Sequence, residues 1–265
     1  MITRRQRPRW CRYRARPESG DNRGMLQVCL NGARSPREHH HLPVRPEELA
    51  RAAAAGVAAG ASDIHLHPKA PGGFDSLDAQ IVAATLRAVR AAAPGVPVGV
   101  TTGAWTTPDP QDRIRLIRSW TVLPDHASVN WHEPGAEDVA QALLDRGIAV
   151  EAGIYSGTGS EQQFLSSPLR HHVLRVLAEV TDLTARGAAT TAEALLERLN
   201  PAPAPVLLHG EGAGAWPVLL LAARRDLDAR IGLEDTLQLP DGGIAADNAE
   251  LVAAAVERIR ARQTS

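Results

Sequence analysis

The sequence predicts a single (β/α)8 barrel, the TIM-barrel class of α/β fold, from two observations. Short apolar runs of strand length alternate with longer, helix-length segments from residue 26 almost to the end of the 265-residue chain. Regular alternation of this kind is typical of a parallel sheet, and eight such units make a closed barrel. A doubly wound open sheet is the alternative, but no glycine-rich dinucleotide-binding fingerprint follows the first strand.

The strands are expected at apolar runs bounded by turn residues. The first of them ends in Asn31-Gly32, a dipeptide that favours a turn. In chain order the predicted strands span residues 26–30, 63–67, 97–101, 127–130, 148–152, 173–180, 205–209 and 229–233.

The helices are expected in the longer segments between the strands. Pro46, followed by two acidic residues, suits the first turn of a helix, where proline fits and negative charge faces the positive end of the dipole. In chain order the predicted helices span residues 46–60, 76–93, 110–120, 136–146, 160–165, 191–199, 213–225 and 248–262.

Composition excludes several classes of function. The chain is 44% hydrophobic with a formal net charge of -1, which argues against nucleic acid or a membrane surface as the main partner. No apolar run reaches the length of a membrane-spanning helix. The two cysteines, Cys11 and Cys29, lie in dissimilar segments, so we expect no disulfide and a cytoplasmic location.

Residues 1–24 differ from the rest of the chain. They are rich in arginine, contain proline and glycine, and show no apolar periodicity. A nucleic-acid-binding arm is one interpretation. We favour a disordered extension, with a single barrel domain over residues 25–265.

Polar side chains follow almost every predicted strand. In barrels of this class the active site forms at the carboxyl ends of the strands, so these side chains are expected to meet around one opening. They are Asn31, His65, His67, Thr101, Thr102, Asn130, Glu151, Glu179, His209, Glu234 and Asp235. Any one of them could instead only tie down a loop.

The pattern His65-Leu66-His67 indicates a metal site. Alternate residues of a strand point to one face, so the two imidazoles project together. Two histidines and one carboxylate form a common catalytic zinc set. Glu234, at the end of the last strand, is the best third ligand, with Glu151, Glu179 and His209 as competitors.

Two further residues near Glu234 are candidates for chemistry. Asp235 suits a base or a substrate contact, with a helix-capping acid pair as the alternative. Arg230, on the same strand, could bind a carboxylate with its planar fork or form a salt bridge. The run of His39, His40 and His41 is expected to be a plain exposed loop, with a loop on the active-site face that contacts an anionic group as the alternative.

These residues are similar to the motifs of the beta-keto acid cleavage enzyme family, whose founding type is 3-keto-5-aminohexanoate cleavage enzyme. The most specific match is Arg-Ile-Gly-Leu-Glu-Asp-Thr-Leu at 230–237, continuing through 239–242 to 252. A second match is Gly-Ala-Ser-Asp-Ile-His-Leu-His at 60–67, preceded by 46–50, and a weaker third is Thr-Thr-Gly at 101–103. The resemblance extends from about Leu26 to the last helix, and the middle third diverges.

The resemblance implies a metal-dependent barrel enzyme. It would convert a beta-keto acid and acetyl-CoA into acetoacetate and a new acyl-CoA, with one divalent metal, usually zinc, on His65, His67 and Glu234. It implies that Asp235 is the base and works with Arg230, and that Thr101 contacts the substrate, with Thr102 and Asn130 as further candidates. It places Glu151 near the substrate and suggests a homo-oligomer.

The chain departs from the family pattern beside the expected pocket. Pro68-Lys69 stands where the family commonly has Arg-Asp, and Gly103-Ala104 replaces paired glycines and precedes Trp105. These departures bear on the identity of the substrate and on the use of acetyl-CoA. Two alternatives therefore stay open, a barrel metallohydrolase and a catalytically silent metal-binding barrel that senses a metabolite.

Overall fold

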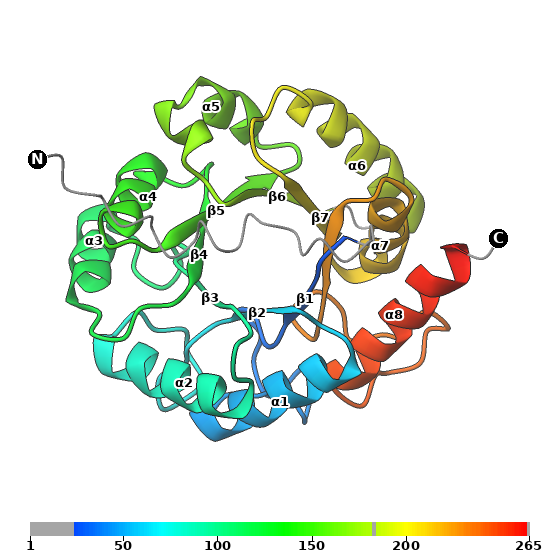
Figure 1. Cartoon of the computed structure of the whole chain (residues 1–265), viewed down its shortest axis with the longest axis horizontal. Coiled ribbons are helices and arrows are strands. Elements are labelled where there is room, and N and C mark those ends of the chain that lie inside the picture. The colour runs from blue at the N-terminus through cyan, green and yellow to red at the C-terminus, as the bar shows by residue number, and fades with distance from the viewer. Residues whose placement is uncertain (1–23, 182–183, 264–265) are drawn as a thin grey trace, which may run out of the picture.

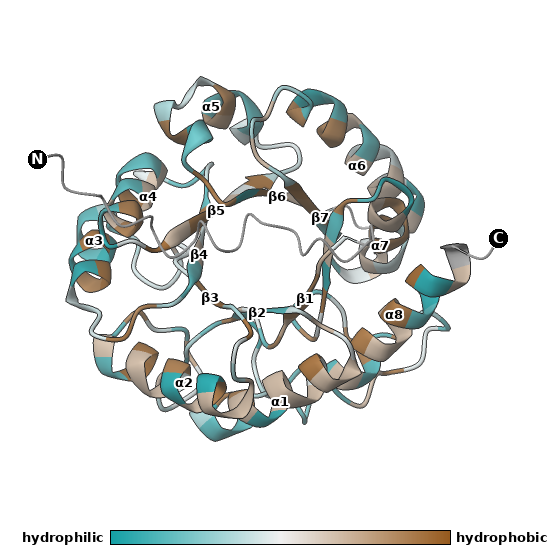
Figure 2. Ribbon diagram, in the orientation of Figure 1, coloured by the Kyte–Doolittle hydropathy of each residue, from teal (hydrophilic) through white to brown (hydrophobic). Residues whose placement is uncertain are grey.

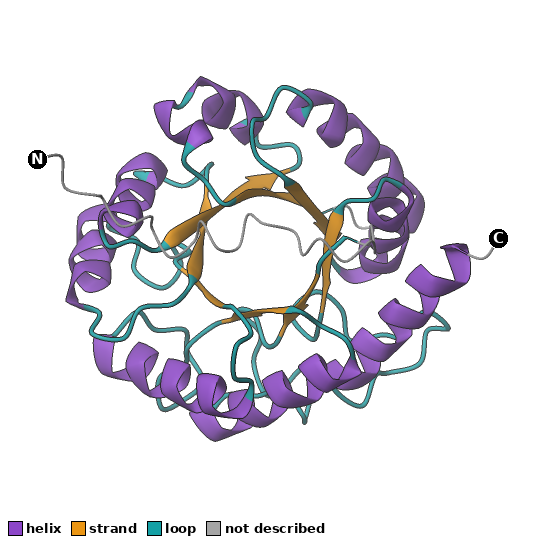
Figure 3. Ribbon diagram, viewed as in Figure 1, coloured by secondary structure: helices purple, strands orange, loops and turns teal. Residues whose placement is uncertain are grey.

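The protein is a closed barrel of eight parallel strands surrounded by helices (Figure 1). The computed structural model describes residues 24–181 and 184–263. Neighbouring strands follow sequence order, and β8 pairs back to β1 to close the ring. Figure 3 shows the strands as an inner ring and the helices as an outer one. The predicted (β/α)8 fold is confirmed, while the proposed extension lies, apart from Gly24, outside the described residues.

Most strands and helices lie within a few residues of their predicted positions. The strands are β1 Leu26–Cys29, β2 Asp63–Leu66, β3 Val98–Thr101, β4 His126–Asn130, β5 Ala149–Tyr155, β6 Arg175–Val180, β7 Val206–Gly210 and β8 Asp228–Ile231. The helices are α1 Pro46–Ala59, α2 Ala79–Ala92, α3 Pro110–Ser119, α4 Ala136–Asp145, α5 Ser160–Ser166, α6 Ala185–Leu199, α7 Ala215–Arg224 and α8 Asn248–Gln263. Short 3-10 turns, η2 Pro168–His171 and η3 Gly212–Gly214, precede β6 and α7.

Two predicted boundaries differ clearly from the structure. Helix α6 begins at Ala185 rather than at residue 191, because the Thr184 hydroxyl caps it by accepting from the Gly187 backbone N–H at 3.1 Å. Strand β8 ends at Ile231 rather than at residue 233. Glu234 and Asp235 therefore lie in the turn that follows the strand, not on the strand itself.

The apolar core lies between the barrel and the helices. Val28, Ile64 and Val100 are completely buried on the outer face of the sheet and belong to one cluster that includes residues from the surrounding helices. Apolar and polar stretches alternate along the helices (Figure 2), as expected where one helix face packs on the barrel. The outer face of the sheet thus supplies the hydrophobic packing that holds the ring of helices.

Charged side chains fill the amino-terminal half of the barrel interior. This barrel-floor network consists of Gln27, Asp63, His126, Glu151 and Arg175, all buried. Arg175 donates to Asp63 at 2.7 Å and to Glu151 at 2.6 Å. His126 lies 3.0 Å from Asp63 and 3.1 Å from Glu151. Pairing within the network offsets the cost of removing these charges from water.

The network shifts the titration of its members. Burial raises the pKa of Asp63, but Arg175 and His126 outweigh burial and lower it to about 2. Burial lowers the pKa of His126, but Glu151 and Asp63 raise it to about 10. The floor is therefore an ionised cluster across neutral pH, placed directly below the carboxyl ends of the strands.

Candidate metal centre and active site

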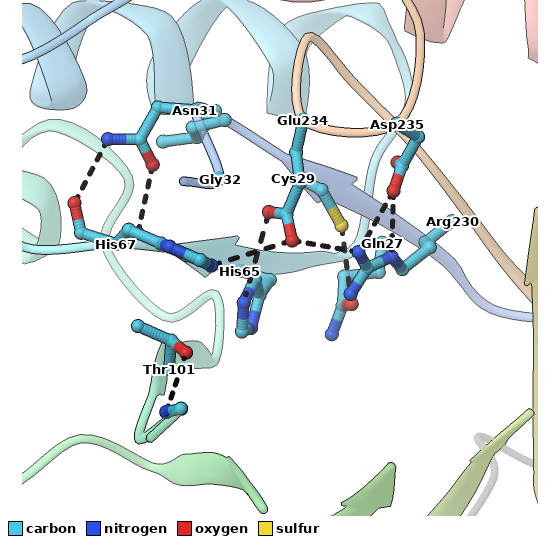
Figure 4. A network of polar contacts seen from close by, with 12 residues as sticks. Gln27, Cys29, Asn31, Gly32, His65, His67, Thr101, Arg230, Glu234 and Asp235 are labelled. Atoms are coloured by element: carbon cyan, nitrogen blue, oxygen red, sulfur yellow. Dashed lines mark hydrogen bonds and ion pairs between the residues drawn. The ribbon is translucent and has the colours of Figure 1, made fainter. Parts of the chain in front are cut away.

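His65, His67 and Glu234 meet at the carboxyl end of the barrel (Figure 4). His65 lies on β2 and His67 directly follows it, and their rings are 5.4 Å apart in an edge-to-face arrangement. The Nε2 atoms of His67 and His65 lie 3.5 Å and 3.9 Å from the two carboxylate oxygens of Glu234. The structure thus brings together the three residues predicted as metal ligands.

The donor set fits a divalent cation. One ligand atom from each of the three residues lies within 4.8 Å of the others, and within residues 24–181 and 184–263 no other such group was found. Bonds of about 2 Å from nitrogen and oxygen to zinc require ligand atoms at about this spacing. The Oε2 atom of Glu234 is buried without a hydrogen-bond partner, as expected of a carboxylate oxygen that faces a cation.

Two glycines allow Glu234 to reach the histidines. A Cβ on Gly232 would lie 1.9 Å from the Cys29 carbonyl oxygen, so only glycine lets the chain cross β1 at this point. A Cβ on Gly32 would lie 2.5 Å from the Glu234 Cγ, and Gly32 also has a positive φ of 55°. The Asp235 and Thr236 amides then bond to the Gly232 carbonyl and form the turn that carries Glu234.

Each histidine faces a carboxylate with its other ring nitrogen. His67 Nδ1 lies 2.7 Å from Asp75 Oδ2 in the loop after β2. His65 Nδ1 lies 3.9 Å from Glu151 Oε2. The Asp75 contact is a hydrogen bond of the kind that fixes the ring and the tautomer of a metal-bound histidine and leaves Nε2 free for the metal, whereas the Glu151 contact is too long for a hydrogen bond. The sequence analysis did not identify Asp75, although the Pro-Gly-Gly turn at 71–73 that returns the chain toward β2 was a usable signal.

The two ligand histidines differ in charge preference. Burial lowers the pKa of His65 to about 3, which keeps its ring neutral. Burial also lowers the pKa of His67, but Glu234 and the Asp75 hydrogen bond outweigh burial and raise it to about 9. Binding of a cation to His67 therefore releases a proton from its imidazole ring.

Arg230 and Asp235 form a buried pair beside the three ligands. Arg230 donates from Nε and Nη2 to one oxygen of Asp235, at 3.1 Å and 2.9 Å, and from Nη2 to Glu234 at 2.9 Å. The second oxygen of Asp235 has no hydrogen-bond partner in the part of the chain that the structure describes. Burial raises the pKa of Asp235 to about 6, although Arg230 and His209 lower it. A carboxylate with one free oxygen and a pKa near neutrality suits a general base.

His209 and Glu179 extend this group away from the metal ligands. The His209 ring lies 3.4 Å from Asp235 Oδ1 and 3.1 Å from Glu179 Oε2. Burial lowers the pKa of His209 to about 4 and raises that of Glu179 to about 7. Both residues were among the polar groups predicted at strand ends, and the structure joins them to Asp235.

The candidate substrate contacts lie in three different settings. The Thr101 hydroxyl accepts from the Gly103 backbone N–H at 3.2 Å, and Figure 4 shows Thr101 below the histidines. The Thr102 hydroxyl donates to the Ser128 carbonyl at 2.6 Å and so ties β3 to β4. The Asn130 amide donates to Glu133 at 2.9 Å. Substrate contact by these three residues stays a prediction.

Glu151 lies below the metal ligands rather than at the mouth of the barrel. It is completely buried, and its carboxylate contacts Arg175, His126 and His65. Its predicted role beside the substrate stays a prediction, and the structure adds a neighbour, since Glu151 Oε2 lies 3.9 Å from His65 Nδ1. The alternation of polar residues along β1, β2 and β5 could have shown that Gln27, Asp63 and Glu151 share the barrel interior.

The histidine run after β1 connects two loops by hydrogen bonds. His39 and His41 bond to the carbonyls of Ala245 and Ala246 at 2.8 Å and 2.7 Å, which joins the loop after β1 to the segment before α8. His39 is 4% exposed, so the prediction of an exposed loop is wrong at that residue.

The described helices include none that is long and apolar enough to cross a membrane.

Comparison with known proteins agrees with the geometry. The profile of a protein family described as beta-keto acid cleavage enzyme matches residues 24–265. A 3-keto-5-aminohexanoate cleavage enzyme from Fusobacterium nucleatum subsp. nucleatum is 25% identical over 247 residues, which cover 86% of this chain and 88% of that protein.

Solved structures share the fold at lower sequence identity. The apo structure of ObcA superposes with a TM-score of 0.67 at 16% identity, over 84% of this chain and 62% of that one. This chain therefore spans less than two thirds of the ObcA chain. The 3-dehydroquinate dehydratase from Geobacillus kaustophilus HTA426 superposes with a TM-score of 0.61 at 11% identity, over 91% of each chain.

Proposed function

The chain belongs to the beta-keto acid cleavage enzyme family, and from that premise we propose that it converts a beta-keto acid and acetyl-CoA into acetoacetate and a new acyl-CoA. The observation that carries this proposal is the contact between two groups. The buried pair Arg230 and Asp235 lies against Glu234, which in turn faces His65 and His67. An electrophilic centre and a base thus adjoin one opening of the barrel.

The bond changes of the proposed reaction balance without an oxidant or reductant. The bond between the keto carbon and the methylene carbon that bears the carboxylate breaks. That carboxymethyl unit becomes bonded to the acetyl carbonyl carbon while the C–S bond of acetyl-CoA breaks, which gives acetoacetate and releases the CoA thiolate. The acyl group of the keto acid becomes bonded to the sulfur of that thiolate, which gives the new acyl-CoA. The proton that the base removes is returned, so no net proton is consumed.

His65, His67 and Glu234 would hold one divalent metal, and zinc suits this donor set best. Such an ion, when bound, acts as a Lewis acid that polarises the ketone oxygen and stabilises enolate charge. One anionic ligand and two neutral ones leave the centre with net positive charge, as an electrophile requires.

The protein's own residues prepare and orient the base. Arg230 uses Nε and Nη2 on Asp235, so it aligns that carboxylate and holds one of its oxygens. The other oxygen of Asp235 is left to take a proton from the attacking group. Glu151 lies below His65, and Thr101, Thr102 and Asn130 are the proposed substrate contacts at the carboxyl ends of β3 and β4.

We also propose that the enzyme is cytoplasmic and homo-oligomeric. The buried free thiol of Cys29 is consistent with a reducing compartment. Size-exclusion chromatography with light scattering measures the oligomeric state directly, and a monomer at working concentrations would contradict that part of the proposal.

A substrate screen tests the proposed function. The purified full chain, loaded with Zn²⁺, is incubated with acetyl-CoA and a panel of beta-keto acids that differ in side chain, and acetoacetate and acyl-CoA are quantified. We expect equal amounts of the two products with at least one keto acid. Stoichiometric metal without turnover on any of them would contradict the proposal and favour the metallohydrolase or the silent metabolite sensor.

A further inference from the structure

Asp75 makes the shortest contact to the metal centre from outside the three ligands. Its Oδ2 atom lies 2.7 Å from His67 Nδ1, and its side chain is only 4% exposed. With Nδ1–H donated to Asp75, the lone pair of His67 Nε2 points toward Glu234, 3.5 Å away. Asp75 thereby selects the tautomer and the ring orientation that a metal at Nε2 needs.

Two further side chains hold the Asp75 carboxylate. Lys69 donates to Asp75 Oδ1 at 2.5 Å and to the Gly32 carbonyl at 2.8 Å, and its own side chain is 1% exposed. The Trp105 indole N–H donates to Asp75 Oδ2 at 2.9 Å. The Trp105 ring also stacks on the His67 ring, with centroids 5.8 Å apart and planes inclined by 20°. Both sides of the carboxylate and one face of the imidazole are thus fixed.

The backbone of the loop after β2 is shaped to present Asp75. Residues 69 and 75 form an antiparallel bridge, and the Ala70 amide donates to the Phe74 carbonyl at 2.8 Å. Gly72 and Gly73, both with positive φ, make the intervening turn. On the neighbouring loop, a Cβ on Gly103 would lie 2.1 Å from the Trp105 ring, so glycine at 103 gives the indole its place.

The two side chains that hold Asp75 come from separate parts of the chain. Lys69 lies in the loop after β2, and Trp105 lies in the loop after β3. The loops are different, yet both side chains bond to the same carboxylate. They are therefore parts of one local arrangement around His67.

We propose that Asp75 is a positioning residue that fixes His67 as a metal ligand, and that Lys69 and Trp105 hold Asp75 in that role. The inference rests on the proposed function only in taking His65, His67 and Glu234 as the metal ligands. It assigns Lys69 and Trp105, in the loops after β2 and β3, to support of the metal, a role distinct from contact with the substrate.

Metal affinity in the absence of substrate tests the inference. Zn²⁺ dissociation constants are measured by chelator competition for the wild-type full chain and for Asp75→Asn, which keeps the shape but removes the charge. Loss of a carboxylate behind a ligand histidine typically weakens metal binding about 10–100-fold. We expect a loss in that range for Asp75→Asn and a smaller one for Trp105→Phe, which keeps an aromatic ring but removes the indole donor.

Glu133→Gln is the matched control. Glu133 is a similarly buried carboxylate that accepts from Arg113 at 2.6 Å and from the Ala104 amide at 2.9 Å, but no contact joins it to a metal ligand among the described residues. We expect it to lower the melting temperature and to leave Zn²⁺ affinity within about two-fold. Equal losses of affinity in Asp75→Asn and Glu133→Gln would show a general effect of loop stability and overturn the inference.

The absorption spectrum of the Co²⁺-loaded protein gives a second readout. A displaced or differently hydrogen-bonded His67 changes the ligand field, so we expect the visible bands of Asp75→Asn to shift while those of Glu133→Gln match the wild type. A folded Asp75→Asn variant with wild-type Zn²⁺ affinity and spectrum would contradict the role of Asp75 but leave the proposed metal centre standing. A wild-type chain that binds neither ion would sink the proposed metal centre as well, which separates the two failures.

Discussion

Asp235 is the side chain on which the proposed chemistry depends most. It is completely buried, Arg230 holds one of its oxygens, and burial raises its pKa to about 6. Because the neighbouring Glu234 makes the contacts to the histidines, the proposed reaction assigns the two adjacent acids different roles, Asp235 as base and Glu234 as metal ligand. This division gives the Asp235 substitution a specific signature.

Asp235→Asn keeps the volume of the side chain but cannot accept a proton. We expect turnover of the keto acid and acetyl-CoA to fall about 10²–10⁴-fold, the usual contribution of a general base. Bound Zn²⁺, measured by elemental analysis, is expected to stay at the wild-type level because the three ligands are intact. A variant with wild-type turnover would show that the base is another residue.

At the residue scale the sequence indicated the candidate ligands better than the residues that support them. His65 and His67 could be paired because alternation along a strand is a local rule, and Glu234 because the last strand borders the first. Asp75 could not be assigned, since its contact with His67 depends on a hairpin turn and on Trp105 from another loop. Glu151 was placed on the right strand, but its depth in the barrel could not be predicted, because depth depends on strand register.

At the scale of strands and helices, sequence periodicity indicates only part of the barrel-floor network. Arg175 opens β6, yet it lies within an apolar run whose first residues suggested a longer strand. Its partners come from β2 and β5, so no local pattern connects them. Buried ionic groups of this kind are recognised only when the strands are brought into register.

His126→Gln tests the network through the pH dependence of stability. The pKa of His126 is raised from 6.5 to about 10, so its favourable contribution is complete below about pH 6.5 and is lost as pH rises toward about 10. Asp63, Glu151 and Arg175 are the charged groups that face it. Removing one partner of a buried ion pair typically costs about 3–5 kcal/mol.

Urea unfolding of the wild type and His126→Gln at about pH 6 and about pH 9.5 measures this effect. We expect the stability difference between the two proteins to be larger at the lower pH, because the wild type loses its imidazolium contribution at the higher one. The exposed His171→Gln serves as the control and is expected to show no comparable trend. A difference that does not change with pH would contradict an ionised His126 in the floor.

At the scale of the whole molecule, the barrel turns distant sequence motifs into one site. Closure of β8 on β1 brings residues 230–235 beside residues 63–67, although more than half of the chain separates them. The fold could be predicted because eight alternating strand and helix units specify a closed barrel and leave few other arrangements. The set of residues that line the carboxyl-end opening of the barrel is less predictable, since the loops after β2, β3 and β8 meet there and share no sequence periodicity.

The central claim is that catalysis in this barrel depends on one divalent metal held by His65, His67 and Glu234. Its most direct test is acetoacetate formation by protein stripped of metal with a chelator and then titrated with Zn²⁺. We predict that stripped protein is inactive and that activity returns in proportion to added metal and saturates at one ion per chain. Full acetoacetate formation by the metal-free protein, with no response to Zn²⁺, would contradict the claim.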